Sequence, residues 1–217
     1  MEGKLCDTMA DPLLIVDLQE GFINDFTRHI PGRVKALIER DDYAPLLFTR
    51  FINVEGSPFR RFVGWHDCAS SPETDLVPEM AGFAREELTF SKLGYAGISE
   101  PLATYLRDHR FERVYIAGID TDMCVLKVAL DIFDLNIEPL ILADCCASTS
   151  GLQSHLAGLA ILARNIGADK LRDAGLLPLS LPKHDANDTH RAFDYTHGSQ
   201  LIRHAMEKHH EQSPRRR

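Results

Sequence analysis

Residues 113–149 read RVYIAGIDTDMCVLKVALDIFDLNIEPLILADCCAST, and this stretch decides the fold. It holds two short apolar runs, 114–117 and 139–143, which are typical of buried β-strands. Between them, residues 123–135 have the length and composition of a helix that is apolar almost all round. A strand, a helix and a second strand in this order form a βαβ unit, whose right-handed crossover makes the two strands parallel.

The expected helix over residues 123–135 carries signals at both ends. Thr121 or Asp122 is expected to cap its N-terminus, and Asn136 to end it. Cys124 then lies in the first turn of the helix, where free backbone N–H groups and the positive end of the helix dipole favour a thiolate. The alternative for this residue, taken alone, is a small buried cysteine without a chemical role.

The composition of the chain indicates a soluble, cytoplasmic protein. Its 217 residues, 44% hydrophobic and 26% charged, suffice for one sizeable core. A net charge of −8, with the basic run 215–217 confined to the very end, gives no footprint for nucleic acid. No apolar run approaches membrane-spanning length and no secretory signal is recognisable, so we expect no membrane partner.

The cysteines do not predict a disulfide framework. Their number, five, is odd, and no C-x-x-C spacing pairs them for a zinc site. We therefore expect reduced thiols. For Cys145 and Cys146, which are adjacent, a strained vicinal disulfide is the alternative to two small residues at the end of a strand.

The rest of the chain continues the alternation of strands and helices. Further strands are expected at 13–16, 44–49, 87–91 and 176–181, and further helices at 31–40, at 99–109 with Ser99 as cap, and at 149–165 with Gly167 after its end. Runs of apolar residues without polar interruption suit strands that are buried on both faces. The sequence therefore predicts an α/β protein, a three-layer α/β/α fold around a doubly wound, mainly parallel six-stranded sheet, similar to a Rossmann fold.

Three residues whose side chains can take part in catalysis lie at the ends of the expected strands or directly after them. Asp17 ends the first strand, Lys92 comes directly after the third, and Cys124 follows the fourth. The carboxyl ends of parallel strands meet at one rim, where doubly wound sheets bind ligands. Taken singly, Asp17 suits a loop cap and Lys92 a solvated charge, but together they supply the base and the positive charge that a thiol nucleophile needs.

The motifs DLQEGF at 17–22, Lys92, and GIDTDMCV at 118–125 together resemble the isochorismatase-like cysteine hydrolase superfamily. That superfamily includes nicotinamidases, N-carbamoylsarcosine amidases and related amidohydrolases, and the resemblance covers residues 13–168. It implies a catalytic triad of Asp17, Lys92 and Cys124. It also implies a cis peptide between Ile119 and Asp120, and an oxyanion hole made by the backbone N–H groups of Asp120 and Cys124.

The resemblance implies an enzyme that cleaves the C–N bond of a small amide, ureido or carbamoyl compound through a thioester on Cys124. True isochorismatases lack this cysteine, so Cys124 argues against cleavage of a vinyl ether. Two alternatives remain. One is a catalytically silent member of the fold that only binds partners, and the other is a thiol redox protein, which the lack of a nearby resolving cysteine in the sequence disfavours.

The chain departs from the superfamily in two places. Nicotinamidases carry a metal-binding Asp-x-His directly after the second strand, where this chain has Phe51-Ile52-Asn53. We therefore expect no catalytic metal and no other cofactor. The second departure is Asp120, where the superfamily has a small residue. Its carboxylate either recognises an N–H or ammonium group of the substrate, or points away and caps the helix.

The long segment 50–86 is rich in glycine, proline and charge, and is expected to be a functional surface or lid. We predict a substrate pocket lined by Gln19, Phe22, Trp65 and Tyr95. Arg60 and Arg61 are either ligands for a substrate carboxylate or ordinary solvated arginines. The segment's exposed aromatic residues, Phe51, Phe59, Phe62 and Trp65, predict burial against a second chain, hence a homo-oligomer, a dimer or tetramer.

The sequence divides into a hydrolase domain at 1–182 and an extension at 183–217. The extension is expected to be partly disordered or to dock on another subunit, above all through residues 201–206. Its histidines recur at spacings of six and seven, but turn-forming residues at 185–188 and Gly198 interrupt any helix that would align them, so a metal site is disfavoured. These histidines are His184, His190, His197 and His204.

Overall fold

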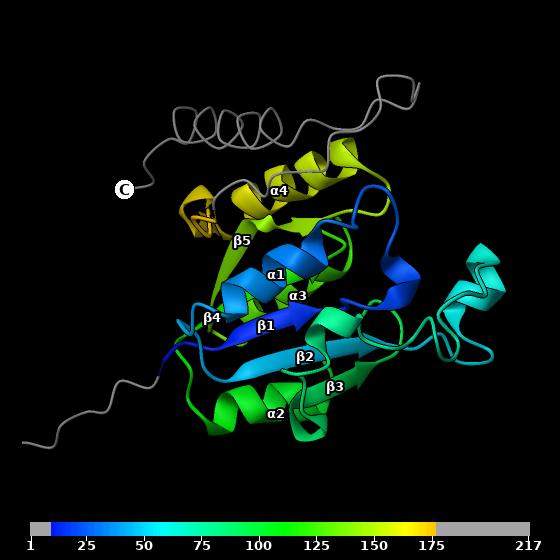
Figure 1. The fold of residues 1–217 in the computed structure, drawn as a ribbon, viewed down its shortest axis with the longest axis horizontal. Coiled ribbons are helices and arrows are strands. Elements are labelled where there is room, and N and C mark those ends of the chain that lie inside the picture. The colour runs from blue at the N-terminus through cyan, green and yellow to red at the C-terminus, as the bar shows by residue number, and fades with distance from the viewer. Residues whose placement is uncertain (1–9, 177–217) are drawn as a thin grey trace, which may run out of the picture.

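A sheet of six parallel strands forms the centre of the fold (Figure 1). The structure is a computed structural model that describes residues 10–176. The strands are β1 (Leu13–Val16), β2 (Leu46–Phe51), β3 (Thr89–Lys92), β4 (Arg113–Ile119), β5 (Glu138–Ala147) and β6 (Leu171–Arg172). Their order in the sheet is β3-β2-β1-β4-β5-β6, so the chain winds outward from β1 to β3 and then returns to build the other half. This confirms the predicted doubly wound sheet.

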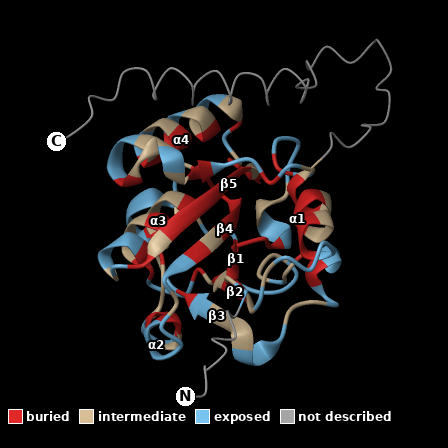
Figure 2. Ribbon diagram, turned by 90° about the vertical axis from the view of Figure 1, so that its left-hand side faces the viewer, coloured by how far each residue is buried: buried red, intermediate tan, exposed pale blue. Residues whose placement is uncertain are grey.

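Helices cover both faces of the sheet, as the end-on view of Figure 2 shows. Helix α1 (Ile30–Ile38) packs on one face, and α2 (Glu100–Asp108), α3 (Cys124–Asp134) and α4 (Leu152–Ile166) pack on the other. The three-layer α/β/α architecture is therefore confirmed. None of these helices is long and apolar enough to cross a membrane, within residues 10–176.

The sheet separates two hydrophobic clusters, and β1 contributes to both. Leu14 and Val16 pack in the cluster under α2, α3 and α4, whereas Leu13 and Ile15 pack in the cluster under α1. All four side chains are fully buried. A strand between two layers of helices needs an apolar residue at every position, which explains the uninterrupted run LLIV.

Some boundaries differ from those predicted. β2 begins at Leu46, after Pro45, and β5 continues to Ala147, past the predicted end at residue 143. The sixth strand lies at Leu171–Arg172, and Leu176 is not in a strand. The rest of the predicted strand 176–181 lies outside the described residues, as does the extension 183–217 with its histidines.

Of the predicted helix ends, only the N-cap of α3 is wrong, and Asn136 follows the end of that helix as predicted. Met123 is the residue before α3, and no side chain caps that helix. Ser99 does precede α2, but its hydroxyl makes no capping hydrogen bond. Gly167 follows α4 as predicted, with a φ of 103° that suits glycine.

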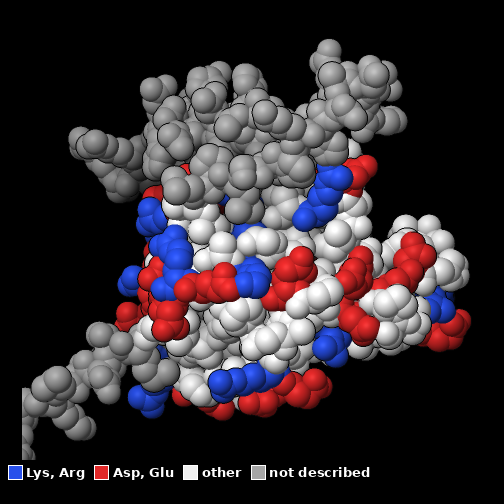
Figure 3. All heavy atoms as spheres, viewed as in Figure 1, with Lys and Arg blue, Asp and Glu red and all other residues white. Residues whose placement is uncertain are grey.

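The segment between β2 and β3 extends from the body of the molecule around the short helix Phe59–Val63, drawn in cyan at the right of Figure 1. Phe51 and Phe59 are buried, which corrects the expectation that the aromatic residues of this segment stay uncovered. Phe62 and Val63 remain 75% and 67% exposed. Acidic and basic side chains are interspersed over the face shown in Figure 3.

The described cysteines are all free thiols, which agrees with the expected reduced state. Cys68, Cys145 and Cys146 are buried and Cys124 is partly exposed. Cys145 and Cys146 lie within β5 and form no vicinal disulfide. Cys6 lies outside the described residues.

Candidate active site

The structure brings Asp17, Lys92 and Cys124 into contact at the carboxyl ends of β1, β3 and β4. The Nζ atom of Lys92 lies 2.7 Å from Oδ2 of Asp17 and 3.3 Å from Sγ of Cys124. Asp17 and Lys92 are buried, whereas Cys124 is partly exposed. One ammonium group therefore contacts both a carboxylate and a thiol, and Cys124 is the least buried of the three residues.

Asp17 is held in an unusual backbone conformation by a neighbouring strand. Its φ is 46°, in the left-handed region that residues other than glycine rarely adopt. The hydroxyl of Thr49, on β2, donates to Oδ1 of Asp17 at 2.7 Å and accepts the backbone N–H of Asp17 at 3.1 Å. Strain of this kind persists only where the surroundings fix the residue, and it clusters at functional sites.

The pKa values of Lys92 and Cys124, the two residues beside Asp17, depend on burial and on the neighbouring charges. Burial lowers the pKa of Lys92, but Asp17 and Cys124 beside it outweigh this, so the pKa is raised above its ordinary value. Burial raises the pKa of the Cys124 thiol, the charge of Asp17 raises it further, and Lys92 opposes both. The resting arrangement is therefore a charged lysine beside a protonated thiol.

The turn that presents Cys124 depends on a close approach of two backbones. Gly118 has a φ of 128°, and a Cβ at this position would meet the carbonyl oxygen of Val16 at 2.2 Å. The carbonyl of Asp120 accepts the N–H groups of Met123 and Val125, which shapes the turn into α3. Cys124 is the first residue of α3, so its own N–H has no acceptor within the helix. The peptide bond between Ile119 and Asp120 is cis.

Asp120 directs its carboxylate at the loop before α4. Oδ1 accepts the backbone N–H of Thr149 at 2.5 Å, and Oδ2 accepts the Thr149 hydroxyl at 2.8 Å. Burial raises the pKa of Asp120 to about 6, and the two hydrogen bonds from Thr149 oppose this shift. Both oxygens thus bond to Thr149, and the side chain tethers two loops. Of the two roles suggested by the sequence, substrate recognition and capping of α3, the structure shows no cap.

Two further contacts tie the turn to α4 and the loop before it, and the sequence pattern did not point to either. His155 on α4 lies 2.7 Å from the hydroxyl of Thr121, and Ser148 donates to Asp122 at 2.5 Å. Burial lowers the pKa of His155 to about 4, so its ring is neutral near pH 7. In the sequence, His155 falls on the apolar face of α4. Only the folded structure shows that this face packs against the turn before α3.

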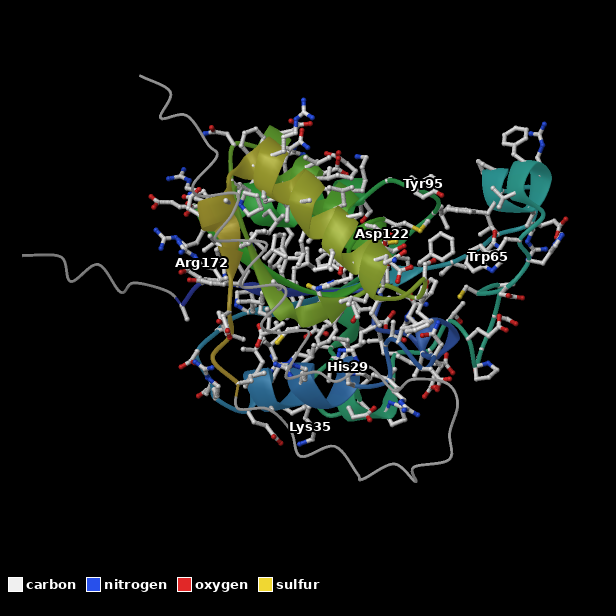
Figure 4. All side chains as sticks on the ribbon, turned by 90° about the horizontal axis from the view of Figure 1, so that it is seen from above. His29, Lys35, Trp65, Tyr95, Asp122 and Arg172 are labelled. Carbon is white, nitrogen blue, oxygen red and sulfur yellow. The ribbon has the colours of Figure 1, made fainter. Side chains whose placement is uncertain are left out.

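Three of the four residues predicted to line the pocket lie in one aromatic group with Phe51 and Phe59. Ring centroids are 6.3 Å apart for Phe22 and Trp65, and 5.7 Å apart for Phe51 and Trp65. Tyr95 joins through Phe59 at 4.8 Å. The group adjoins the triad, because Nζ of Lys92 lies 5.6 Å from the ring centre of Phe51. In Figure 4, Trp65, Tyr95 and Asp122 lie towards one end of the molecule and Arg172 towards the other.

Gln19, the fourth predicted residue, has a different role. Its side chain is fully buried. Its amide nitrogen donates to the carbonyls of Phe51 and Thr74, both at 3.0 Å, and its oxygen accepts the N–H of Phe51 at 2.7 Å. These bonds join the end of β2 to the loop after β1, and they leave the amide unsuited to contact a substrate.

The positions of the nicotinamidase metal motif hold no metal ligands here. Phe51 packs within the aromatic group, and the amide of Asn53 donates to the carbonyls of Trp65 and Asp67 while accepting the Ser57 hydroxyl. Within residues 10–176, no three His, Cys, Asp or Glu side chains lie close enough together to hold a metal ion.

The two arginines considered as carboxylate ligands are placed differently. Arg60 pairs with Glu55 and donates to the carbonyl of Asn53. The guanidinium of Arg61 lies 5.1 Å from the ring centre of Phe62 on the projecting segment. Neither contact involves Asp17, Lys92 or Cys124.

Several proteins that this chain resembles are hydrolases. The nicotinamidase/pyrazinamidase of Mycobacterium tuberculosis is 27% identical over 163 residues, which cover 64% of this chain and 87% of that protein. An isochorismatase-like hydrolase from Alkaliphilus metalliredigens superposes with a TM-score of 0.66 at 19% identity, covering 76% of this chain and 94% of the other. The N-carbamoylsarcosine amidase of Thermoplasma acidophilum gives 0.63 at 19% identity, covering 79% and 100%.

Two of these proteins, the nicotinamidase/pyrazinamidase and the N-carbamoylsarcosine amidase, are hydrolases that act on C–N bonds other than peptide bonds. The chain belongs to the isochorismatase family, because the family's isochorismatase domain matches residues 12–169. The match begins just before β1 and ends just before β6, so it spans all three residues of the triad.

Proposed function

We propose that the protein is a metal-independent cysteine amidohydrolase that cleaves the C–N bond of a small amide, ureido or carbamoyl compound. The observation that carries this proposal is the placement of one lysine nitrogen 2.7 Å from Asp17 and 3.3 Å from Cys124. A nucleophile, a base and a positive charge within contact distance are the groups that covalent acyl transfer needs.

In the proposed mechanism, Asp17 removes the proton from Cys124 while Lys92 stabilises the thiolate. The thiolate attacks the substrate carbonyl, and the N–H groups of Asp120 and Cys124 hold the oxygen as it becomes negative. Asp17 then gives its proton to the departing amine or ammonia. A thioester on Cys124 remains, which water activated by Asp17 hydrolyses. The aromatic group formed by Phe22, Trp65 and Tyr95 is proposed to border the substrate.

A screen of small primary amides and ureido acids with detection of released ammonia tests this function. The wild type and Cys124→Ala are compared on each compound, since the helix turn tolerates alanine but the thioester cannot form. We expect turnover of at least one compound by the wild type and loss of that turnover in the variant. Activity of Cys124→Ala within tenfold of the wild type would show that another group is the nucleophile.

The proposed independence of metal is supported by the side chains at the two motif positions. A phenylalanine ring offers no ligand atom, and the amide of Asn53 already bonds to three groups of the loop. We expect turnover to survive dialysis against EDTA. Activity that is lost on dialysis and restored by zinc or iron would contradict this. Adding back magnesium alone is the control.

We also propose that the protein forms a homo-oligomer. The support is the pair Phe62 and Val63, which stand exposed on the segment that projects beside the site. Apolar side chains grouped in this way are commonly covered by a second subunit. The substrate is the only other partner proposed.

A further inference from the structure

We infer that Thr49 is a positioning residue that confines the proton transfers of Asp17 to one carboxylate oxygen, Oδ2. This inference rests on the proposed function, in which Asp17 is the base. Thr49 lies on β2, touches neither Lys92 nor Cys124 in any hydrogen bond, and therefore acts through Asp17 alone.

The parallel pairing of β1 and β2 places Thr49 beside Asp17. Ile15 is in register with Phe48, so the next residues along bring Thr49 level with the end of β1. The Thr49 side chain is buried, with 1% of its surface exposed, and its hydroxyl makes two hydrogen bonds to the same residue. The bond to Oδ1 fixes the carboxylate, and the bond from the backbone N–H fixes the left-handed turn that carries it.

The hydroxyl of Thr49 has a single proton, which it donates to Oδ1 of Asp17. The oxygen accepts the N–H of Asp17, so its proton is free to go to Oδ1, where the distance is 2.7 Å. If Oδ1 were protonated, its hydrogen and the hydroxyl hydrogen of Thr49 would both lie between the same two oxygen atoms. Oδ1 therefore stays an acceptor as long as Thr49 donates to it.

Oδ2 faces the reacting atoms. Nζ of Lys92 contacts both Oδ2 and the sulfur of Cys124, and a side-chain hydrogen bond joins Asp17 to Cys124. In the first step the S–H bond of Cys124 breaks, its electron pair stays on sulfur, and an O–H bond forms at Oδ2. In the second step that proton passes from Oδ2 to the leaving nitrogen. Thr49 thus makes Oδ2 both the proton acceptor of the first step and the proton donor of the second.

The test compares Thr49→Val, which removes the hydroxyl at nearly constant volume, with Thr49→Ser, which keeps it. Thr89→Val on β3 is the matched control, because its hydroxyl donates at 2.8 Å to the carbonyl of Arg85 and not to the triad. Thr49→Ala serves as a second hydroxyl-free variant in case the valine protein folds poorly. Circular dichroism establishes that each variant is folded.

The first measurement follows the protonation of the Asp17 carboxyl by carbon-13 NMR in a Cys124→Ala background, with Asp17→Asn to assign the signal. A hydrogen bond to the ionised carboxylate favours that form, so losing it should change the protonation equilibrium by about tenfold or more towards the acid. Thr49→Ser and Thr89→Val should leave it unchanged. An unchanged equilibrium in both hydroxyl-free variants would overturn the inference.

The second measurement is the pH profile of kcat/KM on the amide selected by the ammonia screen. Thr49→Val should lower kcat about tenfold or more and move the acidic limb to higher pH, and Thr49→Ser should restore both. If Asp17→Asn turns over normally, the proposed function fails at its base. If Asp17→Asn is inactive but Thr49→Val behaves as the wild type, only the role of Thr49 fails.

Discussion

At the scale of single residues, the thiol of Cys124 is governed by three opposing influences. Burial raises its pKa most, the negative charge of Asp17 adds to this, and Lys92 lowers it. In the mechanism proposed above, such a thiol reacts by transfer of its proton to Asp17 and not as a standing thiolate. The two neighbours should therefore affect its chemical reactivity in opposite directions.

Alkylation by iodoacetamide tests that opposition. Asp17→Asn removes a cause that raises the pKa of Cys124, so its alkylation should extend to lower pH. Lys92→Met removes the cause that lowers this pKa, so alkylation should need higher pH. Mass spectrometry locates the label, with Cys124→Ala as the blank. If both variants move the pH dependence in the same direction, the assignment of charges around the sulfur is wrong.

Asp120 predicts an unusual dependence of stability on pH. Burial raises its pKa to about 6 from an ordinary value of 3.8, so the folded state binds the proton more tightly than the unfolded state. The contribution of Asp120 is then fully present below about pH 4 and is lost as the pH rises through about 6. Its size is at most about 3 kcal/mol, because each pKa unit corresponds to about 1.4 kcal/mol.

Denaturant unfolding of Asp120→Asn across this pH range checks the prediction. Asparagine offers one acceptor to the N–H of Thr149 and one donor to its hydroxyl, so both loops stay tethered. The variant should lack the fall in unfolding free energy between about pH 4 and 6. Asp134→Asn, at an exposed position of α3, is the control and should keep it. If the stability of the wild type relative to Asp120→Asn rises over this range, the sign is wrong.

At the scale of elements, the site depends on how closely α4 approaches the turn before α3. Gly158 on α4 has no side chain, and a Cβ there would lie 2.8 Å from the backbone of Asp122. Backbone atoms cannot move aside as the end of a flexible side chain can. The helix and the turn are therefore packed directly against each other at this glycine.

Gly158→Ala should destabilise the protein by about 1 to 3 kcal/mol, the usual range for overpacking, despite the better helix propensity of alanine. Gly82→Ala is the matched control, because a Cβ there meets nothing within 4 Å. It should change stability by less than about 0.5 kcal/mol. Thermal unfolding of both variants decides the matter, and equal effects would show that the contact is looser than described.

The sequence predicted these elements well where burial leaves a continuous signal. The run at 13–16 is apolar at every position because both of its faces are covered, and the helix predicted at 123–135 is found at Cys124–Asp134. The ends of the helices and strands were predicted less accurately. β5 reaches Ala147 through a shift in its register against β4, and such irregularities leave no periodic mark in the sequence.

The residues of the site were predictable to the extent that they end strands. Asp17, Lys92 and Cys124 lie at the carboxyl ends of β1, β3 and β4, and the structure brings them together. Thr49 and His155 were not predictable, because their roles arise from contacts across 32 and 34 residues of sequence. A buried threonine in a strand has the same local pattern whether or not a carboxylate lies beside it.

At the scale of the whole molecule, the projecting segment predicts self-association. Phe62→Asp together with Val63→Ser should shift an oligomer towards the monomer, because a charge on the covered face opposes its burial. Light scattering measures this against the chain mass of 24.4 kDa. Leu93→Ser, which removes another exposed apolar residue outside the segment, is the control. An active wild-type monomer at assay concentration would refute the proposed oligomer.

The winding order of the sheet also bears on biosynthesis. Asp17, Thr49, Lys92 and Cys124 leave the ribosome in that order, from the end of β1, from β2, from β3 and from the start of α3. Because β4 pairs with β1, the last residue to emerge must return beside the first. No shorter nascent chain can bring Asp17, Lys92 and Cys124 together, so this group forms only after four of the six strands have been synthesised.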